Sequence, residues 1–324
     1  MIKLVIDTLG SDNGYIPSVK GSIRALNEID DLYLVLAGHK DEILELLSTL
    51  SYDKSRVEIL DSKDEINNHD HPVEAIKNKK ESSLVKSLNY LKENDDTLGL
   101  VNASSTGALL AGSTLIVGRI GRMRPAMATL LPNDKGQLTV LTDCGANIDP
   151  RPEQVLNFAI MGSALAKAIL EIPEPKVAIL SNGSEEGKGN ELTKESYQLI
   201  KESSLNFIGN KEGNDALDGE ANVIVSDGFS GNVFLKTVEG SAKIIIKEIF
   251  KMAKMESNPQ YQELGQKLIK RYDFTSLGGA ILIGVNKVIV KGHGNANEDT
   301  WYACTKLCYK VSKNNLVENI KTYL

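Results

Sequence analysis

The strongest constraint on the fold is an alternation, repeated along the chain, between short apolar runs and longer amphipathic segments. Runs rich in Val, Ile and Leu, such as LYLVLAG (32–38) and KVAILSN (176–182), have the length and composition of buried strands. The segments between many of them space their apolar residues as one face of a helix does, for example PEQVLNFAIMGSALAKAIL (152–170). This alternation predicts βαβ units, and therefore a mostly parallel sheet covered by helices.

We expect one α/β domain that spans residues 1–324. Its expected strands are KLVIDT, LYLVLAG, RVEIL, LGLVNA, LTVLTD, KVAILSN, NFIGN, NVIVSD and AILIGVNKVIVKG. The segment 251–274 is less regular and carries Asn258-Pro259, a typical turn signal. It predicts a projecting helical hairpin at about residues 243–274.

Composition and charge exclude several classes of function. The chain has 324 residues and a formal net charge of −6, so its surface as a whole does not attract nucleic acid or an anionic membrane. Cys144, Cys304 and Cys308 are irregularly spaced, which does not fit a disulfide framework, and the chain shows no zinc-ligand spacing. It has neither the pattern of a signal peptide nor an apolar run of about 18 residues. We expect a cytoplasmic protein without a metal, in which any anion site is built locally.

Five of the expected strands end in the same kind of loop. In each, an Asp or Asn is followed by glycine and small polar residues, and usually by a helix start. The five are VIDTLGSDNG, LVNASSTGALLAG, VLTDCGANIDPRPE, AILSNGSEEGKGNELTKE and IVSDGFSGNVFLK. Ligands of open parallel sheets bind beyond the carboxyl ends of the strands. If these five strands are parallel, their loops converge on one cleft.

The residues in these loops suit an anion. Ser105 and Thr106 can cap the helix that follows them, and Gly107 lets a ligand approach the backbone N–H groups at the helix start. Lys188 and Lys236 make a pair of cations suited to phosphate or to a developing oxyanion. A plain turn is the alternative interpretation of each loop taken alone. Neither the Walker spacing nor the Rossmann spacing occurs, which disfavours a nucleotide site.

Two further side chains complete this set. Asn232 precedes Lys236 by four residues, so a helix places both on one face. His293 follows the last expected strand, between the two glycines of KGHGNAN. An imidazole there can act as a general acid or base, or as an oxyanion partner, although an exposed structural histidine is the alternative.

Taken in order, these motifs resemble the PlsX family of phosphate acyltransferases over nearly the whole chain. The matching segments are GRIGRMRPAMATLLP, DCGANIDPRPEQVLNFAIMGS, GKGNELTKE, SDGFSGNVFLKTVEG and GGAILIGVNKVIVKGHG. The resemblance implies an α/β/α sandwich like those of isocitrate dehydrogenase and phosphotransacetylase, assembled as a homodimer. It also implies transfer of an acyl group from a thioester, such as that of acyl carrier protein, to inorganic phosphate. In members of the family the acyl phosphate serves phospholipid synthesis, and the resemblance implies the same role here, with no metal or organic cofactor.

That reaction gives the candidate residues their expected roles. Phosphate has to be desolvated and aimed at a carbonyl carbon, and the carbonyl oxygen gains charge during the attack. We expect Lys188, Asn232, Lys236 and His293 around the reacting atoms. The residues expected to bind substrate or phosphate, or to orient those that do, are Asp7, Ser105, Thr106, Gly107, Asn147, Asn190, Asp227, Gly228 and Gly231.

Some segments depart from the usual pattern of the family. The expected hairpin tip, KMESNPQYQE (254–263), is polar where the family is normally apolar, which argues against membrane docking. A second relative also fits: the α subunit of component C of glycine, sarcosine and betaine reductases, which forms acetyl phosphate with a reductase partner subunit. Cys308 would then be the candidate thiol, and burial as a small apolar residue is the alternative for it.

Two other classes of function remain alternatives. One is a non-catalytic scaffold that binds an acyl carrier. The other is a decarboxylating dehydrogenase, which would need a metal-binding aspartate cluster. Asp143 and Asp149 are present, but the sequence shows no second set of aspartates on a helix to complete such a cluster.

Overall fold

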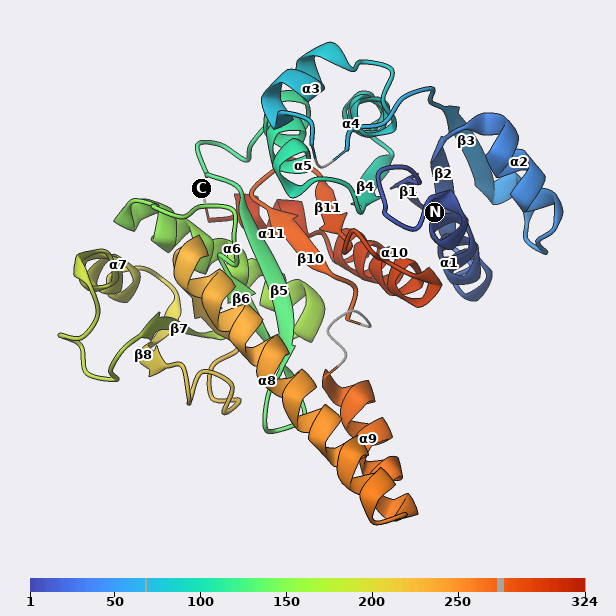
Figure 1. Ribbon diagram of the computed structural model, residues 1–324. Coiled ribbons are helices and arrows are strands. Elements are labelled where there is room, and N and C mark those ends of the chain that lie inside the picture. The colour runs from blue at the N-terminus through green and yellow to red at the C-terminus, as the bar shows by residue number, and fades with distance from the viewer. Residues whose placement is uncertain (68, 273–276, 324) are drawn as a thin grey trace.

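The computed structural model describes residues 1–67, 69–272 and 277–323. Within these ranges eleven strands form one sheet, with helices on both of its faces (Figure 1). The strands are β1 (Ile2–Asp7), β2 (Leu32–Gly38), β3 (Val57–Asp61), β4 (Thr97–Asn102), β5 (Ala126–Pro132), β6 (Leu138–Thr142), β7 (Lys176–Ser181), β8 (Asn206–Glu212), β9 (Val223–Val225), β10 (Ala280–Ile283) and β11 (Val288–Lys291). The helices are α1 (Tyr15–Glu28), α2 (Lys40–Ser48), η1 (Lys54–Arg56), α3 (Pro72–Asn78), α4 (Ser83–Glu93), α5 (Thr106–Gly112), η2 (Ser113–Val117), α6 (Pro152–Leu170), α7 (Glu191–Lys201), α8 (Gly228–Met255), α9 (Pro259–Tyr272), α10 (Glu298–Lys313) and α11 (Leu316–Lys321).

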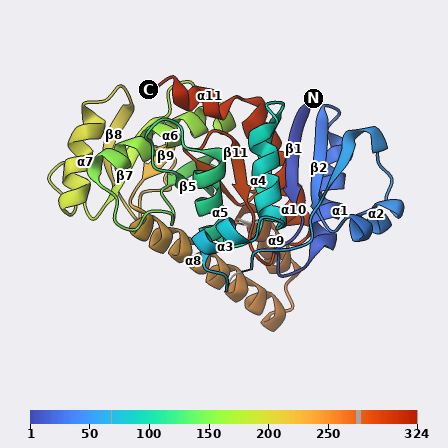
Figure 2. The same ribbon diagram turned by 90° about the horizontal axis from the view of Figure 1, so that it is seen from above.

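The sheet consists of two parallel parts that run in opposite directions. Its strand order is β3-β2-β1-β4-β11-β10-β5-β6-β9-β7-β8, and Figure 2 shows it extending from β8 at one end to β2 near the other. Pairing is parallel from β3 to β11 and again from β6 to β8. Three antiparallel pairings, β11–β10, β10–β5 and β5–β6, join the two parts. The predicted α/β class with a mostly parallel sheet is confirmed, but the condition that all five loop-bearing strands are parallel is wrong.

The short antiparallel strands nevertheless bring carboxyl ends from both parts to one row of the sheet. Asn102 at the end of β4 pairs with Lys291 at the end of β11, and Lys291 pairs with Ala280 at the start of β10. The residue after Ala280 pairs with Ala128 of β5, which pairs with Thr142, the last residue of β6. The loops after β4, β11 and β6 therefore begin close to one line across the sheet, although β6 runs the other way.

Two details of the strands differ from the sequence prediction. The run AILIGVNKVIVKG, expected as one strand, is the antiparallel hairpin of β10 and β11. Gly284 follows β10 with φ 90°, a backbone conformation that glycine adopts readily and other residues rarely do. Strand β5 was not expected, because Pro125 and Pro132 bound its sequence and proline is normally a strand breaker.

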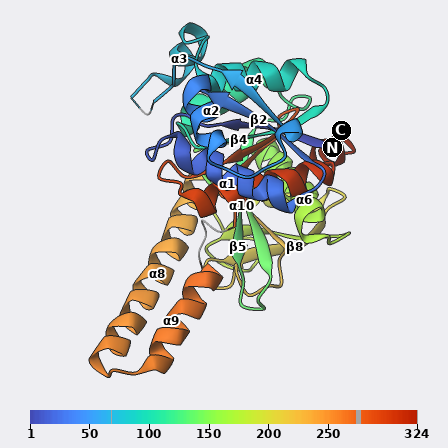
Figure 3. The same cartoon turned by 90° about the vertical axis from the view of Figure 1, so that its right-hand side faces the viewer.

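Two apolar clusters, one on each face of the sheet, form the core. Trp301 of α10 and Phe158 of α6 are among the largest buried side chains of the first, which also involves α1, α2 and α11. Leu88 of α4 belongs to the second, together with side chains of α3 and α5. Figure 3 shows α4 on one side of β2 and β4, with α1, α6 and α10 on the other. The result is a sandwich of helices, sheet and helices.

Helices α8 and α9 pack side by side and project from the sandwich as an arm (Figure 1, Figure 3). Helix α8 ends at Met255 and α9 begins at Pro259, as the Asn258-Pro259 turn signal predicts. The carboxamide oxygen of Asn258 accepts a hydrogen bond from the Gln260 N–H (2.9 Å). The last two residues of the expected hairpin, 273 and 274, lie outside the described residues. Within the described part of the chain, no helix combines the length and apolar character needed to cross a membrane.

Candidate active site

A cavity of about 350 Å³ lies where the carboxyl ends of the strands meet. Its walls come from the loops after β4, β6 and β11, from the β5–β10 pair and from α8. Its lining includes Thr106, Met127, Thr129, Cys144, Gly145, Asn232, Leu235, Lys236, Glu239, Ala280, Lys291 and His293. Four of the predicted site residues, Thr106, Asn232, Lys236 and His293, are therefore brought together. We call this space the central cavity.

The start of helix α8 is packed directly on the loop after β6. Asp227 caps the helix, its carboxylate accepting the Ser230 N–H at 2.8 Å, and Gly228 N–H donates to the carbonyl of Asn147 at 2.7 Å. A Cβ added to Gly228 would lie 2.8 Å from the Asn147 nitrogen, and one added to Gly231 would overlap the loop backbone. Both glycines lie inside α8 and are explained by this close packing, rather than by a bend in the chain.

Asp143, which the sequence analysis did not select for the site, organises that loop. Its buried carboxylate accepts backbone N–H groups of Met127 (2.9 Å) and Asn147 (2.6 Å). Burial raises the pKa of Asp143, and the hydrogen bonds from these N–H groups oppose the rise. An Asp directly after an apolar run, in TDCGAN, is the sequence signal that could have identified it.

Asn147 was expected to hold phosphate, and the geometry argues against that role. The side chain is buried, and its amide nitrogen donates to the carbonyl of Pro125 and to Asp143 Oδ2, each at 2.9 Å. A carboxamide has only two N–H donors, so both are used within the protein, one inside the loop and one toward the residue before β5. Asn147 positions the loop that carries Cys144 and Gly145.

Asn232 and Lys236 lie one helical turn apart on the face of α8 above the central cavity. Among the described residues, the amide of Asn232 donates one hydrogen bond, to the carbonyl of Cys144 (3.2 Å), so its second N–H is available to a ligand. Lys236 Nζ forms an ion pair with Glu239 Oε2 at 2.8 Å. The Lys236 side chain is 51% exposed and that of Glu239 is 14% exposed, so the ammonium group reaches the open part of the cavity.

His293 and Lys291 bring two more titratable groups from the end of β11. Partial desolvation lowers the pKa of His293, and the positive charge of Lys236 lowers it further, although the side chain remains exposed. Lys291 was not predicted as a site residue. Burial lowers the pKa of its ammonium group to about 8. Its signal in the sequence is a lysine at the end of an apolar run, directly before Gly-His-Gly.

The loop after β4 reaches the cavity through Thr106. Ser105 occupies the N-cap position of α5 but forms no side-chain capping hydrogen bond. A Cβ on Gly107 would lie 2.8 Å from the Pro72 ring, so packing against α3 explains this glycine. Whether Ser105 and Gly107 contact phosphate stays a prediction.

Asp7 lies buried behind this loop and does not line the central cavity. Its Oδ2 accepts a hydrogen bond from the Asn102 amide (2.7 Å), and Asn102 Oδ1 accepts the Ser104 N–H (3.0 Å). Burial raises the pKa of Asp7 to about 6, against the effect of hydrogen bonds from Ser83 and Asn102. A role for Asp7 in orienting the groups that bind substrate stays a prediction.

The structure does not bring Lys188 to the central cavity. Lys188 is exposed in the loop after β7, where its backbone N–H donates to the carbonyl of Glu185 at 3.0 Å. Asn190 caps α7 by accepting the Thr193 N–H at 2.8 Å. The pairing of Lys188 with Lys236 around one phosphate is therefore not supported by the geometry, and a separate role for Lys188 stays a prediction.

Cys308 does not have the surroundings of a reactive thiol. It is fully buried against Gly99 and Leu100 of β4, and burial raises the pKa of its thiol, which disfavours the reactive thiolate. The structure favours the interpretation of Cys308 as a small apolar core residue. Among the described residues, no group of three or more His, Cys, Asp or Glu side chains is placed to hold a metal ion.

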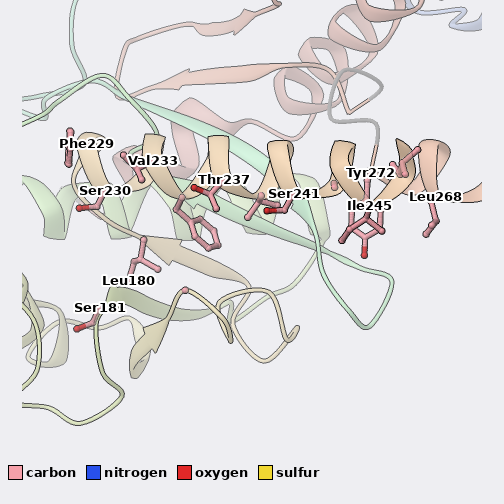
Figure 4. Close-up of a pocket in the computed structure, with 15 residues that line it drawn as sticks. Leu180, Ser181, Phe229, Ser230, Val233, Thr237, Ser241, Ile245, Leu268 and Tyr272 are labelled. Atoms are coloured by element: carbon pink, nitrogen blue, oxygen red, sulfur yellow. The ribbon is translucent and has the colours of Figure 1, made fainter. Parts of the chain in front are cut away.

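A larger and more apolar cavity, of about 840 Å³, lies along another face of α8 (Figure 4). It extends from Leu180 and Phe229 at the start of the helix to Leu268 and Tyr272 of α9. Its lining is Leu180, Ser181, Gly213, Phe229, Ser230, Val233, Phe234, Thr237, Val238, Ser241, Ala242, Ile245, Ile246, Leu268 and Tyr272, none of them a charged residue.

Comparison with known proteins places the chain in a family. Residues 2–319 match the family described as "Fatty acid synthesis protein". The chain belongs to this family. It is 40% identical over 333 residues to a phosphate acyltransferase of Clostridium tetani, covering 100% of this chain and 98% of the relative. It is 38% identical over 335 residues to a phosphate acyltransferase of Clostridioides difficile, with coverages of 100% and 96%. The predicted membership of the PlsX-type phosphate acyltransferase family is confirmed.

Solved structures support the fold of this phosphate acyltransferase family member. A phosphotransacetylase from Streptococcus pyogenes superposes with a TM-score of 0.61 at 19% identity, covering 98% of this chain and 94% of that one. A branched-chain phosphotransacylase from Enterococcus faecalis gives a TM-score of 0.61 at 15% identity, with coverages of 96% and 99%. The expected likeness to phosphotransacetylase is therefore confirmed for the fold.

Proposed function

We propose that this phosphate acyltransferase moves an acyl group from a thioester to inorganic phosphate, releasing an acyl phosphate and a free thiol. The observation that carries the proposal is the central cavity, which Asn232 and Lys236 of α8 line together with Lys291 and His293 from the end of β11. These groups can replace the hydration of a phosphate dianion and hold it beside an ester carbonyl. The family membership supports the same reaction.

The chemistry assigned to each group follows from its charge and donors. Lys236 attracts the phosphate dianion, and the free N–H of Asn232 donates to the carbonyl oxygen as that oxygen gains charge. His293, whose pKa is lowered, is neutral near pH 7 and can accept the proton of the attacking phosphate. Cys144 also lines the cavity, but burial raises the pKa of its thiol, so direct attack by phosphate is favoured over a covalent enzyme intermediate.

The resemblance to the family also underlies our proposals for the partners. We propose acyl carrier protein as the donor of the acyl group, a homodimer as the assembly and the cytoplasm as the compartment. Light scattering of the purified protein would test the homodimer directly. A panel of acetyl and longer acyl thioesters, on coenzyme A and on acyl carrier protein, would identify the donor. Turnover restricted to acetyl thioesters would favour the component C relative instead.

The test of the reaction itself is phosphate-dependent thiol release. The purified protein is incubated with an acyl thioester, free thiol is measured with a colorimetric reagent, and acyl phosphate is trapped with hydroxylamine. We expect thiol and acyl phosphate to appear in equal amounts with phosphate, and neither with sulfate at the same ionic strength. Binding of the carrier without thiol release would show the non-catalytic scaffold.

A further inference from the structure

Lys291 occupies the centre of the row where the carboxyl ends of the strands meet. It is the last residue of β11 and pairs with Asn102 of β4 on one side and with Ala280 of β10 on the other. This double pairing fixes its backbone, and its side chain lines the central cavity together with that of His293. Lys291 therefore approaches the cavity from the sheet, whereas Lys236 approaches it from α8.

The ammonium group of Lys291 has capacity left for a ligand. Its one hydrogen bond within the described chain is to the carbonyl of Gly292 (2.6 Å), and an ammonium group has three N–H donors. Among the described residues no carboxylate lies within ion-pair distance of it, whereas Lys236 is paired with Glu239. The titratable or charged groups around this part of the cavity are Asp12 in the loop after β1, Cys144 after β6, Lys236, Glu239 and Lys243 of α8, His293 after β11, and Cys304 of α10.

We propose that Lys291 is a catalytic residue, the general acid that protonates the departing thiolate. The inference rests on the acyl transfer proposed above. An oxygen of HPO₄²⁻ forms a bond to the carbonyl carbon while its proton passes to the His293 imidazole. The C–S bond then breaks, its electron pair stays on sulfur, and a proton from Lys291 Nζ completes the thiol. The proton on His293 returns through solvent to the Lys291 amine, so the sum is thioester plus HPO₄²⁻ giving acyl phosphate and thiol.

The electrostatics of the two groups agree with these roles. Burial lowers the pKa of Lys291 to about 8, close to the ordinary thiol value of about 8.5. An acid matched in this way gives up its proton readily to an alkyl thiolate. The pKa of His293 is lowered from 6.5. Near pH 7 Lys291 is therefore mostly protonated and His293 is mostly neutral, which are the states that the reaction requires.

The decisive experiment varies the leaving group. Wild type and K291M are compared on an alkyl thioester of pantetheine and on an aryl thioester of thiophenol, both with phosphate. We expect K291M to lower kcat by about 100-fold on the alkyl thioester, a normal contribution for general acid catalysis. On the aryl thioester we expect a loss of less than about threefold, because an aryl thiolate leaves without protonation. Equal losses on both substrates would overturn the proposal.

A second variant separates the proton from the charge. K291R keeps a positive charge but cannot deliver a proton near neutral pH. We expect K291R to be as slow as K291M on the alkyl thioester, and restored turnover in K291R would overturn the assignment. In wild type, kcat on the alkyl thioester should fall above about pH 8, where Lys291 loses its proton, and this decline should be absent in both variants.

Lys287, the residue directly before β11, provides a matched control at the other end of the strand. It too has a pKa lowered by burial, but its ammonium donates to the Thr97 carbonyl (2.6 Å), away from the central cavity. K287M should keep the wild-type leaving-group dependence and pH profile. Thermal unfolding of each variant identifies any that fail to fold, and K291R then gives the same comparison with the charge retained. Absence of phosphate-dependent turnover in wild type would instead overturn the acyl transfer itself.

Discussion

Gly231 packs so closely against the backbone carbonyl of Asp143 that a Cβ on Gly231 would overlap that oxygen. The contact joins the first turn of α8 to the loop after β6, which the Asp143 carboxylate holds through backbone N–H groups. Asn232 and Lys236 follow Gly231 on the same helix, so their position over the central cavity depends on this contact.

Substitution of Gly231 should therefore separate packing from helix propensity. We expect Gly231→Ala to lower the free energy of unfolding by about 3 kcal/mol, the upper part of the range for overpacking. Gly240→Ala, in the same helix, meets nothing within 4 Å and should raise it by about 0.5–1 kcal/mol, the helix propensity difference. Urea denaturation measures both changes. Equal effects of the two substitutions would show that α8 shifts freely on the loop.

Lys188 and Lys236, which the sequence analysis paired around one phosphate, should differ in their effect on the KM for phosphate. Lys236 lines the central cavity, whereas Lys188 lies in the loop after β7. We expect Lys236→Ala to raise the KM for phosphate at least tenfold, which corresponds to the loss of one charge-assisted hydrogen bond of about 1.5 kcal/mol. Lys188→Ala should change it less than about twofold. Steady-state kinetics at varied phosphate concentration measure both KM values. A larger rise for Lys188→Ala than for Lys236→Ala would place the phosphate site in the loop after β7.

How much of the fold could be predicted from sequence depends on whether a feature is set by residues near in the sequence or by residues far apart in it. Strand ends and helix caps are local, so the pattern of apolar runs located Asp227 and Asn190 near helix starts, where they act as caps. Strand direction is not local. The reversal between the two parts of the sheet is produced by β10, β5 and β6, and the sequence prediction contained neither β5 nor the turn at Gly284.

In the candidate site, too, residues with a local sequence signal were predicted and residues placed by tertiary packing were missed. Asn232, Lys236 and His293 were found because each follows an apolar run within a few residues, and the structure brings them together. Lys291 was missed because a lysine inside an expected strand is usually an exposed edge residue. Its partly buried position follows from pairing with two other strands. Asn147 was assigned to phosphate because the sequence does not show which groups its amide binds. Its partners, Pro125 and Asp143, are brought to it by tertiary packing.

The Asn232 amide should act mainly in the transition state. Its free N–H is available to the carbonyl oxygen, which becomes negative only during attack. We expect Asn232→Ala to lower kcat about 100-fold, with little change in the KM for phosphate. Asn232→Asp has the same size but cannot donate and should be at least as slow. Full activity of the Asp variant in steady-state assays would contradict donation by this side chain.

Asp7 should make stability depend on pH in a direction opposite to that of a salt-bridged carboxylate. Its pKa in the folded chain is about 6 because of burial, above the value of about 3.9 in an unfolded chain. The folded state therefore holds the Asp7 proton more tightly, and the contribution of Asp7 to stability is complete below about pH 4 and is lost as the pH rises through 6.

A pKa shift of about 2 units corresponds to about 3 kcal/mol in the free energy of unfolding. Because an unfolded Asp is already about half ionised at pH 4, we expect wild type to lose about 2 kcal/mol of this relative to Asp7→Asn between pH 4 and pH 7, measured by urea denaturation at each pH. Asp61→Asn, which removes an exposed carboxylate at the end of β3, controls for the general loss of a negative charge. A difference between wild type and Asp7→Asn that stays constant with pH would show that the Asp7 carboxyl group is not desolvated in solution.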